Sequence, residues 1–475
     1  MLTPIEAATP GKTKRAVLAA ASNLLAAIRP SSQYKRDGAG LVCSALIAQA
    51  IQALSTPFLG RLYSPSAYGV WSLLLSAAAI PAALGGFRYE LAITLSETDE
   101  EAANVGALNI ACLLFTTILT AGGVVLWTNS FASALGIGEY RHWLGALPAI
   151  VFILGFAQTS NYWLIRYKSF RSLAIYRITQ SLATAAAQSA AWPLWPGPEG
   201  LISGGVFGYF TPAILFLAEF WKKYRHLLRA VSWRGLSKAA RKFRNFPRYV
   251  VPYGFVAVAR DRGIFLLLGI YASTHVLGLY ATAVRLAYAP VQLIAASLSP
   301  IVYRRACDHP VVREAAPMVY RVLKTVTVCT VPLFVAIAWF ARDGFAILMG
   351  ARWREAGLYA SMFAIPASLQ ALSGPLDRML DLVSRQKVSL AIEVSYSVLA
   401  LAAAGLSLAS GGGVTLCVAT FGALTICYHL ARVAAVYRFC GFPKSDMFKL
   451  GGIYMSLAGG TALILFVATR KNPWT

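Results

Sequence analysis

Long apolar segments alternate with short polar ones along almost the whole chain of 475 residues. A helix satisfies its own backbone hydrogen bonds inside a membrane, so helices of about 20 residues are the expected form of such segments. No alternating ten-residue strands of the kind that build a membrane barrel appear. The pattern predicts an all-α, polytopic membrane protein of 12–13 transmembrane helices. Thirteen apolar segments lie near residues 39–59, 68–86, 104–127, 143–165, 172–192, 201–221, 249–271, 279–301, 317–340, 357–376, 388–409, 413–434 and 447–468.

The composition agrees with this class. Hydrophobic residues make up 57% of the chain and charged residues only 13%, whereas soluble domains carry about 25% charged residues. A formal net charge of +24 first suggests nucleic-acid binding. The Lys and Arg residues, however, lie in short loops between the apolar segments, which is typical of membrane topology. We therefore expect no nucleic-acid partner.

Loop charges orient the predicted helices, because cytoplasmic loops retain Lys and Arg. The basic loops lie at 12–36, 166–171, 222–248, 304–313 and 378–387. The intervening loops at 192–200, 272–278 and 411–413 contain no Lys or Arg, while 341–356 is the weakest case. The acidic stretch 97–101 is interpreted as a solvated helix start. This alternation predicts a cytoplasmic N-terminus.

A weak repeat crosses the basic segment at 222–248. A constant offset of 209 residues relates Gly60, Gly69 and Trp71 to Gly269, Gly278 and Tyr280. Each set falls at the joint between the first two helices of its half, where glycine allows a tight turn. We expect two pseudo-symmetric six-helix lobes around a central cavity, as in many transporters.

The predicted organisation has five parts. Residues 438–475 form an additional C-terminal helix, which either spans the membrane or is half inserted, and this leaves the position of Arg470 and Lys471 open. An apolar segment at 16–28 with basic flanks is too short to span and is predicted to be an interfacial helix. The other parts are a cytoplasmic N-terminal segment at 1–36, an N-lobe of helices 1–6 at 37–221, a basic cytoplasmic linker at 222–248 and a C-lobe of helices 7–12 at 249–437.

No catalytic or metal-binding pattern is visible. The seven cysteines are scattered without a CxxC pair, and the five histidines are spread out. There is no nucleotide-binding loop and no HExxH or GxSxG motif. We expect no cofactor, no metal and no enzymatic activity.

Several short motifs resemble a known family. Residues 60–65 read Gly-Arg-Leu-Tyr-Ser-Pro and lead to Tyr68-Gly69, and residues 88–93 read Arg-Tyr-Glu-Leu-Ala-Ile. Asp261-Arg262 followed by Gly278-Leu279-Tyr280 is similar to the seventh and eighth helices of the same family. These motifs resemble polysaccharide-biosynthesis flippases of the multidrug/oligosaccharidyl-lipid/polysaccharide exporter superfamily. The resemblance covers roughly residues 35–305.

The resemblance implies a function. Such proteins translocate undecaprenyl-diphosphate-linked oligosaccharide from the cytoplasmic to the periplasmic leaflet of the bacterial inner membrane, for surface or exopolysaccharide biosynthesis. The expected partners are this polyprenyl-diphosphate-linked oligosaccharide, membrane lipids, and a polysaccharide polymerase and chain-length proteins. The alternatives are a cation-coupled multidrug antiporter of the same superfamily, and a membrane scaffold or enzyme of polysaccharide assembly.

Charged residues inside apolar segments give the candidate site, since buried charge usually faces a polar cavity or a partner. Arg260, Asp261 and Arg262 lie near the middle of segment 249–271, and Arg285 lies in the next segment. Successive helical residues are about 100° apart, so Arg260 and Arg262 point to separate faces. A guanidinium group suits a diphosphate. The substrate-binding candidates are Arg260, Arg262 and Arg285; the alternative is a structural ion-pair network between helices.

Other polar residues are weaker candidates. Asp261 and Glu393 are candidates for ion coupling or for pairing with the arginines, unless Glu393 lies in water near the inner surface. Arg88 and Glu90 are candidates for a gate or for an ion pair across a helix boundary. Amide side chains inside apolar segments are expected to join helices, and some of them to line a path for sugars: Gln49, Gln52, Gln158, Asn161, Gln180, Gln292 and Gln370.

Overall fold

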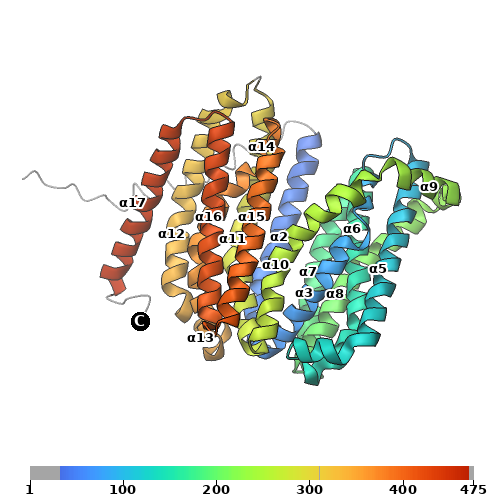
Figure 1. The fold of residues 1–475 in the computed structure, drawn as a ribbon, viewed down its shortest axis with the longest axis horizontal. Coiled ribbons are helices and arrows are strands. Elements are labelled where there is room, and N and C mark those ends of the chain that lie inside the picture. Colours follow the sequence, from blue (N-terminus) through green and yellow to red (C-terminus); the bar gives the residue numbers. More distant parts are fainter. Residues whose placement is uncertain (1–32, 310, 470–475) are drawn as a thin grey trace, which may run out of the picture.

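The computed structural model describes residues 33–309 and 311–469, and the elements it assigns there are helical (Figure 1). Thirteen helices of 20 residues or more follow one another through these residues, which confirms the all-α prediction. They are α2 (Gln33–Leu62), α3 (Pro65–Gly85), α5 (Asp99–Ala134), α6 (Leu147–Arg166), α7 (Phe170–Ala191), α8 (Pro198–Lys223), α10 (Val251–Tyr271), α11 (Thr274–Cys307), α12 (Ala316–Met349), α13 (Arg354–Ser373), α15 (Gln386–Ala409), α16 (Gly413–Phe439) and α17 (Lys444–Thr469).

Ten long helices in the described ranges have the length and hydropathy needed to cross a membrane. The chain is a multi-pass membrane protein. Helix α10 falls outside that group because Arg260, Asp261 and Arg262 interrupt it. Helix α13 is packed between α11, α12 and α16, so it does not need an apolar outer surface.

The long helices form two lobes that lie side by side in Figure 1. Helices α2, α3 and α5–α8 pack together as the N-lobe, and α10–α13, α15 and α16 as the C-lobe. Helix α17 packs on the outside of the C-lobe, against α12. Helix α10 contacts α15 of its own lobe and α3 of the other lobe, so it lies between the two.

Shorter elements lie between the long helices. Helix α4 (Tyr89–Ile93) follows α3, α9 (Trp233–Lys242) lies between the lobes in sequence, and α14 (Met379–Leu382) precedes α15. The 3-10 turns are η1 (Gly138–Ala146), η2 (Arg225–Ala230), η4 (Val312–Ala315), η5 (Ala351–Trp353) and η6 (Gly374–Leu376), and η3 (Phe246–Val250) is a π turn.

Helices α3 and α11 begin in the same way. Ser64 caps α3 by accepting a hydrogen bond from the backbone N–H of Ala67, and Ser273 caps α11 by accepting one from Val276. A serine oxygen at this position satisfies a backbone donor that the helix cannot use itself. Both the caps and their donors are separated by the 209-residue offset of the repeat.

Two of the repeated glycines, Gly69 and Gly278, lie where these two helices cross. A Cβ atom on Gly69 would lie 1.8 Å from the carbonyl oxygen of Thr274, and one on Gly278 would lie 1.8 Å from that of Pro65. Thr274 and Pro65 are themselves related by the same offset, so each half makes the same contact with the other. We call this end of the bundle the crossing end. Only glycine allows the backbones to come this close.

Two arginines join the lobes at the crossing end by capping each other's helix. Arg61 at the end of α2 donates from Nε to the Leu348 carbonyl and from Nη2 to that of Ile347, both at 2.8 Å. Arg352 donates to the carbonyls of Gly60 at 3.1 Å and of Arg61 at 2.7 Å. The last carbonyls of a helix lack partners within it. These four bonds, the arginine clamp, therefore satisfy the ends of α2 and α12.

Apolar side chains fill the space beneath the clamp. Tyr63, Leu73, Tyr280 and Trp353 are among the largest fully buried side chains, and they come from both lobes. The Trp353 indole also donates to the Gly60 carbonyl at 2.8 Å. The largest buried cluster therefore contains side chains of both lobes.

The basic linker docks on the N-lobe at the opposite end. Asn104 of α5 donates to the Ala230 carbonyl at 3.0 Å and accepts from the backbone N–H of Ser232 at 3.1 Å. Lys242 of α9 pairs with Glu97 at 2.9 Å and with Glu101 at 2.7 Å. These hydrogen bonds raise the pKa of Lys242. The acidic stretch starts α5, as expected, and it also holds the linker.

Several helices are longer than their apolar segments. Helix α12 continues to Met349, nine residues beyond the predicted segment end at 340, and includes Arg342 and Asp343. Charged side chains at the end of a bundle can reach water while the backbone remains helical. The interfacial helix predicted at 16–28 lies outside the described residues, as do Arg470 and Lys471. The five predicted domain boundaries stay predictions.

The crossing gives a first testable prediction. Replacing Gly69 with Ala is expected to lower the free energy of unfolding by about 1–3 kcal/mol, because the new methyl group overlaps a backbone carbonyl. Gly452→Ala on α17 is the matched control, because nothing lies within 4 Å of its added Cβ atom. Thermal unfolding in detergent measures the stability of both variants. Equal midpoints for the two variants would contradict the close crossing.

The arginine clamp gives a second testable prediction. Replacing Arg61 and Arg352 together with Ala removes four hydrogen bonds between the lobes and should populate states with a separated crossing end. Distances between spin labels on the α2–α3 and α12–α13 turns, measured by pulsed electron resonance, should become longer and broader. The exposed Arg171, replaced with Ala, is the control. An unchanged distance distribution in the double variant would show that the clamp does not hold this end.

Candidate functional site: a charged central cavity

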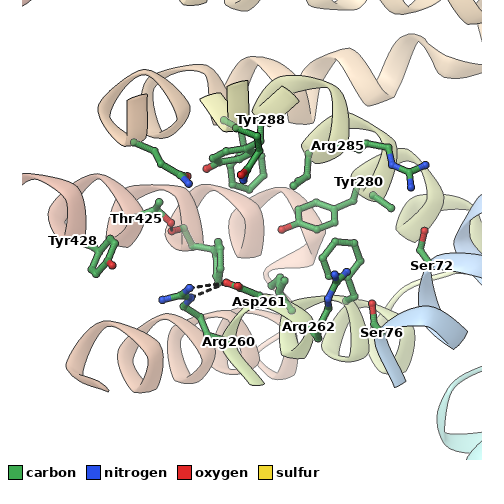
Figure 2. Close-up of a pocket in the computed structure, with 18 of the residues that line it drawn as sticks. Ser72, Ser76, Arg260, Asp261, Arg262, Tyr280, Arg285, Tyr288, Thr425 and Tyr428 are labelled. Carbon is green, nitrogen blue, oxygen red and sulfur yellow. Dashed lines mark hydrogen bonds and ion pairs between the residues drawn. The ribbon is translucent and has the colours of Figure 1, made fainter. Parts of the chain in front are cut away.

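A cavity of about 640 Å³ lies beneath the crossing end. Its walls come from α3, α10, α11, α13, α15 and α16, so both lobes contribute (Figure 2). It extends from Tyr68 and Tyr280 near the crossing to Asp377 and Arg432 toward the opposite end. Cavities of about 300–1,000 Å³ are typical of small-molecule sites.

All three charged residues of α10 line this cavity, and their side chains point in different directions. Figure 2 shows Arg260 and Asp261 joined to each other, whereas Arg262 lies beside Ser76 of α3. Arg285 of α11 is exposed in the cavity, on the same side as Ser72. The separation of Arg260 and Arg262 follows from the 100° step between successive helical residues.

Arg260 is held by ion pairs and aromatic contacts. It forms ion pairs with Asp261 at 2.7 Å and with Glu393 of α15. Its guanidinium group lies 5.3 Å from the ring centre of Tyr396 and 6.0 Å from that of Tyr428. Its side chain is only 15% exposed. A cation surrounded in this way is bound to the protein and has little capacity left for a ligand.

The network continues along the C-lobe. The Tyr428 hydroxyl donates to Oε2 of Glu393 at 2.6 Å, and Arg432 donates to the Tyr428 oxygen at 2.7 Å. Arg432 also pairs with Asp377 at 2.9 Å. Burial raises the pKa of Asp377, and the Arg432 charge opposes that shift. One chain of ion pairs and hydrogen bonds therefore connects helices α10, α15 and α16 with the turn that contains Asp377.

Arg262 and Arg285 differ from Arg260. Neither makes a hydrogen bond or ion pair among the residues that the structure describes. The lining contains four guanidinium groups and three carboxylates, which leaves one positive charge in excess. Because all three carboxylates are paired with Arg260 and Arg432, Arg262 and Arg285 are the two guanidinium groups of the lining without a carboxylate partner.

A second cavity, of about 390 Å³, lies within the N-lobe. Residues of α3, α5, α6 and α8 surround it, and α10 contributes Val258 and Arg262. Because Arg262 and Leu75 line both cavities, the two are neighbours. We call this second space the side chamber.

Arg88 and Glu90 lie in the wall of the side chamber. Their side chains form an ion pair at 3.6 Å. Arg88 has a positive φ of 60°, a conformation that a non-glycine residue rarely adopts. Glu90 also accepts from Asn109 at 3.1 Å, and Thr159 donates to Asn109 at 2.6 Å. Burial raises the pKa of Glu90, and the nearby Arg88 charge opposes the shift.

The predicted site residues therefore fall into two groups. Arg260, Arg262, Arg285, Asp261 and Glu393 line the central cavity, and Arg88 and Glu90 line the side chamber. Asp261 pairs with Arg260 and not with Arg285. The side chain of Glu393 is 12% exposed and paired, so its charge does not rest in bulk water. The coupling role of Glu393 and the gate role of Arg88 and Glu90 stay predictions.

Some lining residues were not predicted. Arg432 lies inside the apolar segment 413–434, so the rule that selected Arg260 could have found it. Asp377, Tyr396 and Tyr428 carried no such signal, because one lies in a loop and tyrosines are common in helices. His429 is buried and hydrogen-bonded to Ser373 at 2.8 Å, beside this network.

Comparison with known proteins identifies the family. The model of a family described as polysaccharide biosynthesis protein matches residues 58–357, well over half of the chain. The chain belongs to this family. The match includes α10 and the first part of the C-lobe, and therefore Arg260, Arg262 and Arg285. No curated protein matches the sequence.

Solved structures show the same fold. The lipid II flippase MurJ in an inward closed conformation superposes with a TM-score of 0.69 at 12% identity, covering 91% of this chain and 94% of MurJ. An inward-facing multidrug resistance transporter of the MATE family, within the MOP superfamily, gives 0.61 at 14% identity, covering 86% and 96%. The eukaryotic MATE transporter AtDTX14 gives 0.54 at 14% identity, covering 93% and 99%. At such identities the likeness establishes the fold alone.

The Arg260 network yields a third prediction. Arg260→Met should lower the free energy of unfolding by about 3–5 kcal/mol, because Glu393 is left buried without its cation. Adding Glu393→Gln should restore most of the loss, and Asp261→Asn alone should cost less because Asp261 is 61% exposed. Unfolding midpoints of the single and double variants measure the coupling.

The exposed pair Arg354–Asp343, with side chains 64% and 50% exposed, serves as control. Arg354→Met should change the stability by less than about 1 kcal/mol. If the Arg260 variant resembles this control, the pair with Glu393 is not a buried ion pair in the protein.

Proposed function

We propose that this protein translocates undecaprenyl-diphosphate-linked oligosaccharide from the cytoplasmic to the periplasmic leaflet of the bacterial inner membrane, for surface or exopolysaccharide biosynthesis. The observation that carries the proposal is the pair of guanidinium groups without a carboxylate partner, Arg262 and Arg285, in the central cavity of a polysaccharide biosynthesis protein. The fold shared with a lipid II flippase supports it.

The chemistry of the two arginines fits a diphosphate. A guanidinium group donates parallel hydrogen bonds to phosphate oxygens and keeps its charge at every physiological pH. Arg262 lies on α10 and Arg285 on α11, so a diphosphate between them would neutralise both. In this arrangement Arg260 acts as a positioning residue, because its ion pairs with Asp261 and Glu393 orient α10 within the C-lobe.

Loop charges predict how the protein lies in the membrane, and this orientation is used for the proposed transport. With a cytoplasmic N-terminus, the crossing end faces the periplasm, and the linker and α14 face the cytoplasm. A head group would enter from the cytoplasmic leaflet while its isoprenoid tail stays in lipid. Release would then require the crossing end to separate, including the bonds of Arg61 and Arg352.

A multidrug antiporter is the second candidate, because MATE transporters share the fold. The three carboxylates of the cavity favour it as cation ligands, but each of them already has an arginine partner. The unpaired charges are positive, which favours an anionic ligand. For an enzyme the support is weaker, because the described part of the chain contains no cluster of three or more residues that could hold a metal.

The proposed function also implies protein partners that act on the translocated lipid-linked oligosaccharide. A lipid-linked oligosaccharide released outside would be the substrate of a polysaccharide polymerase, and chain-length proteins would act with it. Both partners follow from the family resemblance.

The proposal gives a fourth prediction. Replacing both Arg262 and Arg285 with Ala should reduce transport at least about a hundredfold, since each charged hydrogen bond contributes about 1.5–3 kcal/mol. Clearance of lipid-linked oligosaccharide from the inner leaflet of a flippase-null strain measures this. Arg171→Ala, which removes an exposed arginine outside both cavities, is the control.

The same strain separates the two candidate functions. Normal surface polysaccharide in the Arg262/Arg285 variant would count against diphosphate binding. Resistance to cationic drugs conferred by the wild-type protein, and retained in that variant, would favour the antiporter.

A further inference from the structure

The side chamber contains free hydrogen-bonding groups beside the diphosphate-binding arginines. Gln158 of α6 lines it with an exposed amide, and Tyr209 of α8 contributes a hydroxyl group. Neither side-chain group makes a hydrogen bond within residues 33–309 and 311–469. An amide offers two donors and an acceptor, and a phenol offers one of each. These groups are suited to the hydroxyl and amide substituents of a sugar.

Apart from Arg262, the charged groups of the wall offset each other. Arg88 is paired with Glu90, and Asn109 donates a hydrogen bond to Glu90 and accepts one from Thr159. Away from Arg262, the wall therefore carries no net charge. Glu90 would repel a second phosphate, and Arg88 and Arg262 would repel a cationic drug. An uncharged polar ligand avoids both repulsions.

The junction with the central cavity is the point where such a ligand would be linked. Arg262 lines both spaces, and it is the cation of the side chamber that has no carboxylate partner. Trp71 of the central cavity and Tyr209 of the side chamber are neighbours, with ring centres 6.5 Å apart. Aromatic rings offer an apolar face together with a polar edge. A sugar ring, with its own apolar face and polar rim, matches this pair.

The free space is created by small residues of α3. Ala79, Ala82 and Ala83 face the chamber, and larger side chains there would fill it. An isoprenoid tail that entered the chamber would cover Gln158 and Tyr209 without replacing their hydrogen bonds to water. Each buried, unsatisfied group costs about 1–3 kcal/mol. The polar groups therefore favour a sugar over the tail.

From these observations we propose that the side chamber is the saccharide subsite, which binds the sugar attached directly to the diphosphate while Arg262 and Arg285 hold the phosphates. Gln158 and Tyr209 are the residues that recognise the sugar. This inference rests on the proposed function, and it adds that the N-lobe selects the glycan whereas the C-lobe holds the anion. Different side chains therefore recognise the sugar and hold the diphosphate.

Binding of defined lipids to the purified full chain in lipid nanodiscs tests the inference. The probes are undecaprenyl diphosphate without sugar and the same lipid carrying one glucose, one galactose or one N-acetylglucosamine. The wild-type protein should bind at least one sugar-bearing lipid about tenfold more tightly than the sugar-free lipid. Gln158→Leu and Tyr209→Phe should each reduce that preference about three- to tenfold, because each removes hydrogen bonds worth about 0.5–1.5 kcal/mol. Neither change should alter affinity for the sugar-free lipid.

A matched variant controls for general damage. Gln180→Leu makes the same change on α7, outside both cavities. It should keep the preference for the sugar-bearing lipid. Ala79→Leu, which fills the side chamber, should abolish it. Unfolding midpoints identify any variant that fails to fold.

The outcomes are separable. If the wild-type protein binds sugar-free and sugar-bearing lipids equally, or if Gln158→Leu weakens both to the same extent, the saccharide subsite is wrong and the proposed flippase function stands. If Gln158→Leu tightens binding of the sugar-free lipid, the chamber holds the apolar tail and the inference is overturned. If the wild-type protein binds none of the diphosphate lipids, the proposed function itself fails.

Discussion

The architecture depends on the close crossing of α3 and α11. Gly69 lies against the Thr274 backbone and Gly278 against the Pro65 backbone, so the two halves touch through equivalent positions. Any side chain at these positions would push the helices apart. The contact fixes the pseudo-two-fold relation between the lobes and brings α2 and α12 close enough for Arg61 and Arg352 to cap each other's helix. With the lobes joined at one end, the space beneath them remains open as the central cavity.

The charges of α10 have divided roles because of how a helix distributes side chains. Arg260 turns toward the C-lobe, where Glu393 and Asp261 balance it, and its burial is tolerated for that reason. Arg262 turns toward the N-lobe, where the described residues provide no carboxylate partner for it. One helix therefore supplies both an ion pair with its own lobe and an unpaired cation in the cavity wall. The structural interpretation of the triplet applies to Arg260, and the substrate-binding role of Arg262 stays a proposal.

The same fold occurs in proteins with different substrates, since a lipid II flippase and a multidrug resistance transporter both superpose on this chain. The substrate class therefore has to be argued from the side chains of the cavities. In the central cavity the acidic groups are paired and two arginines are left over. In the side chamber the charges of Arg88 and Glu90 offset each other, and neutral polar groups remain. The two spaces differ in the chemistry they can bind, and Arg262 belongs to both.

The sequence by itself determined the helical class, the number of long helices and the repeat, because membrane burial forces long apolar segments and glycine marks close crossings. It also singled out Arg260, Arg262, Arg285 and Glu393, since charges in apolar segments are rare. Only the tertiary structure decided which of these charges are free. Ion pairing depends on which helices become neighbours: Glu393 lies 133 residues from Arg260, and no local pattern predicts that they meet. The side chamber has the same origin, because Gln158, Tyr209 and Arg262 lie on three helices that only packing brings together.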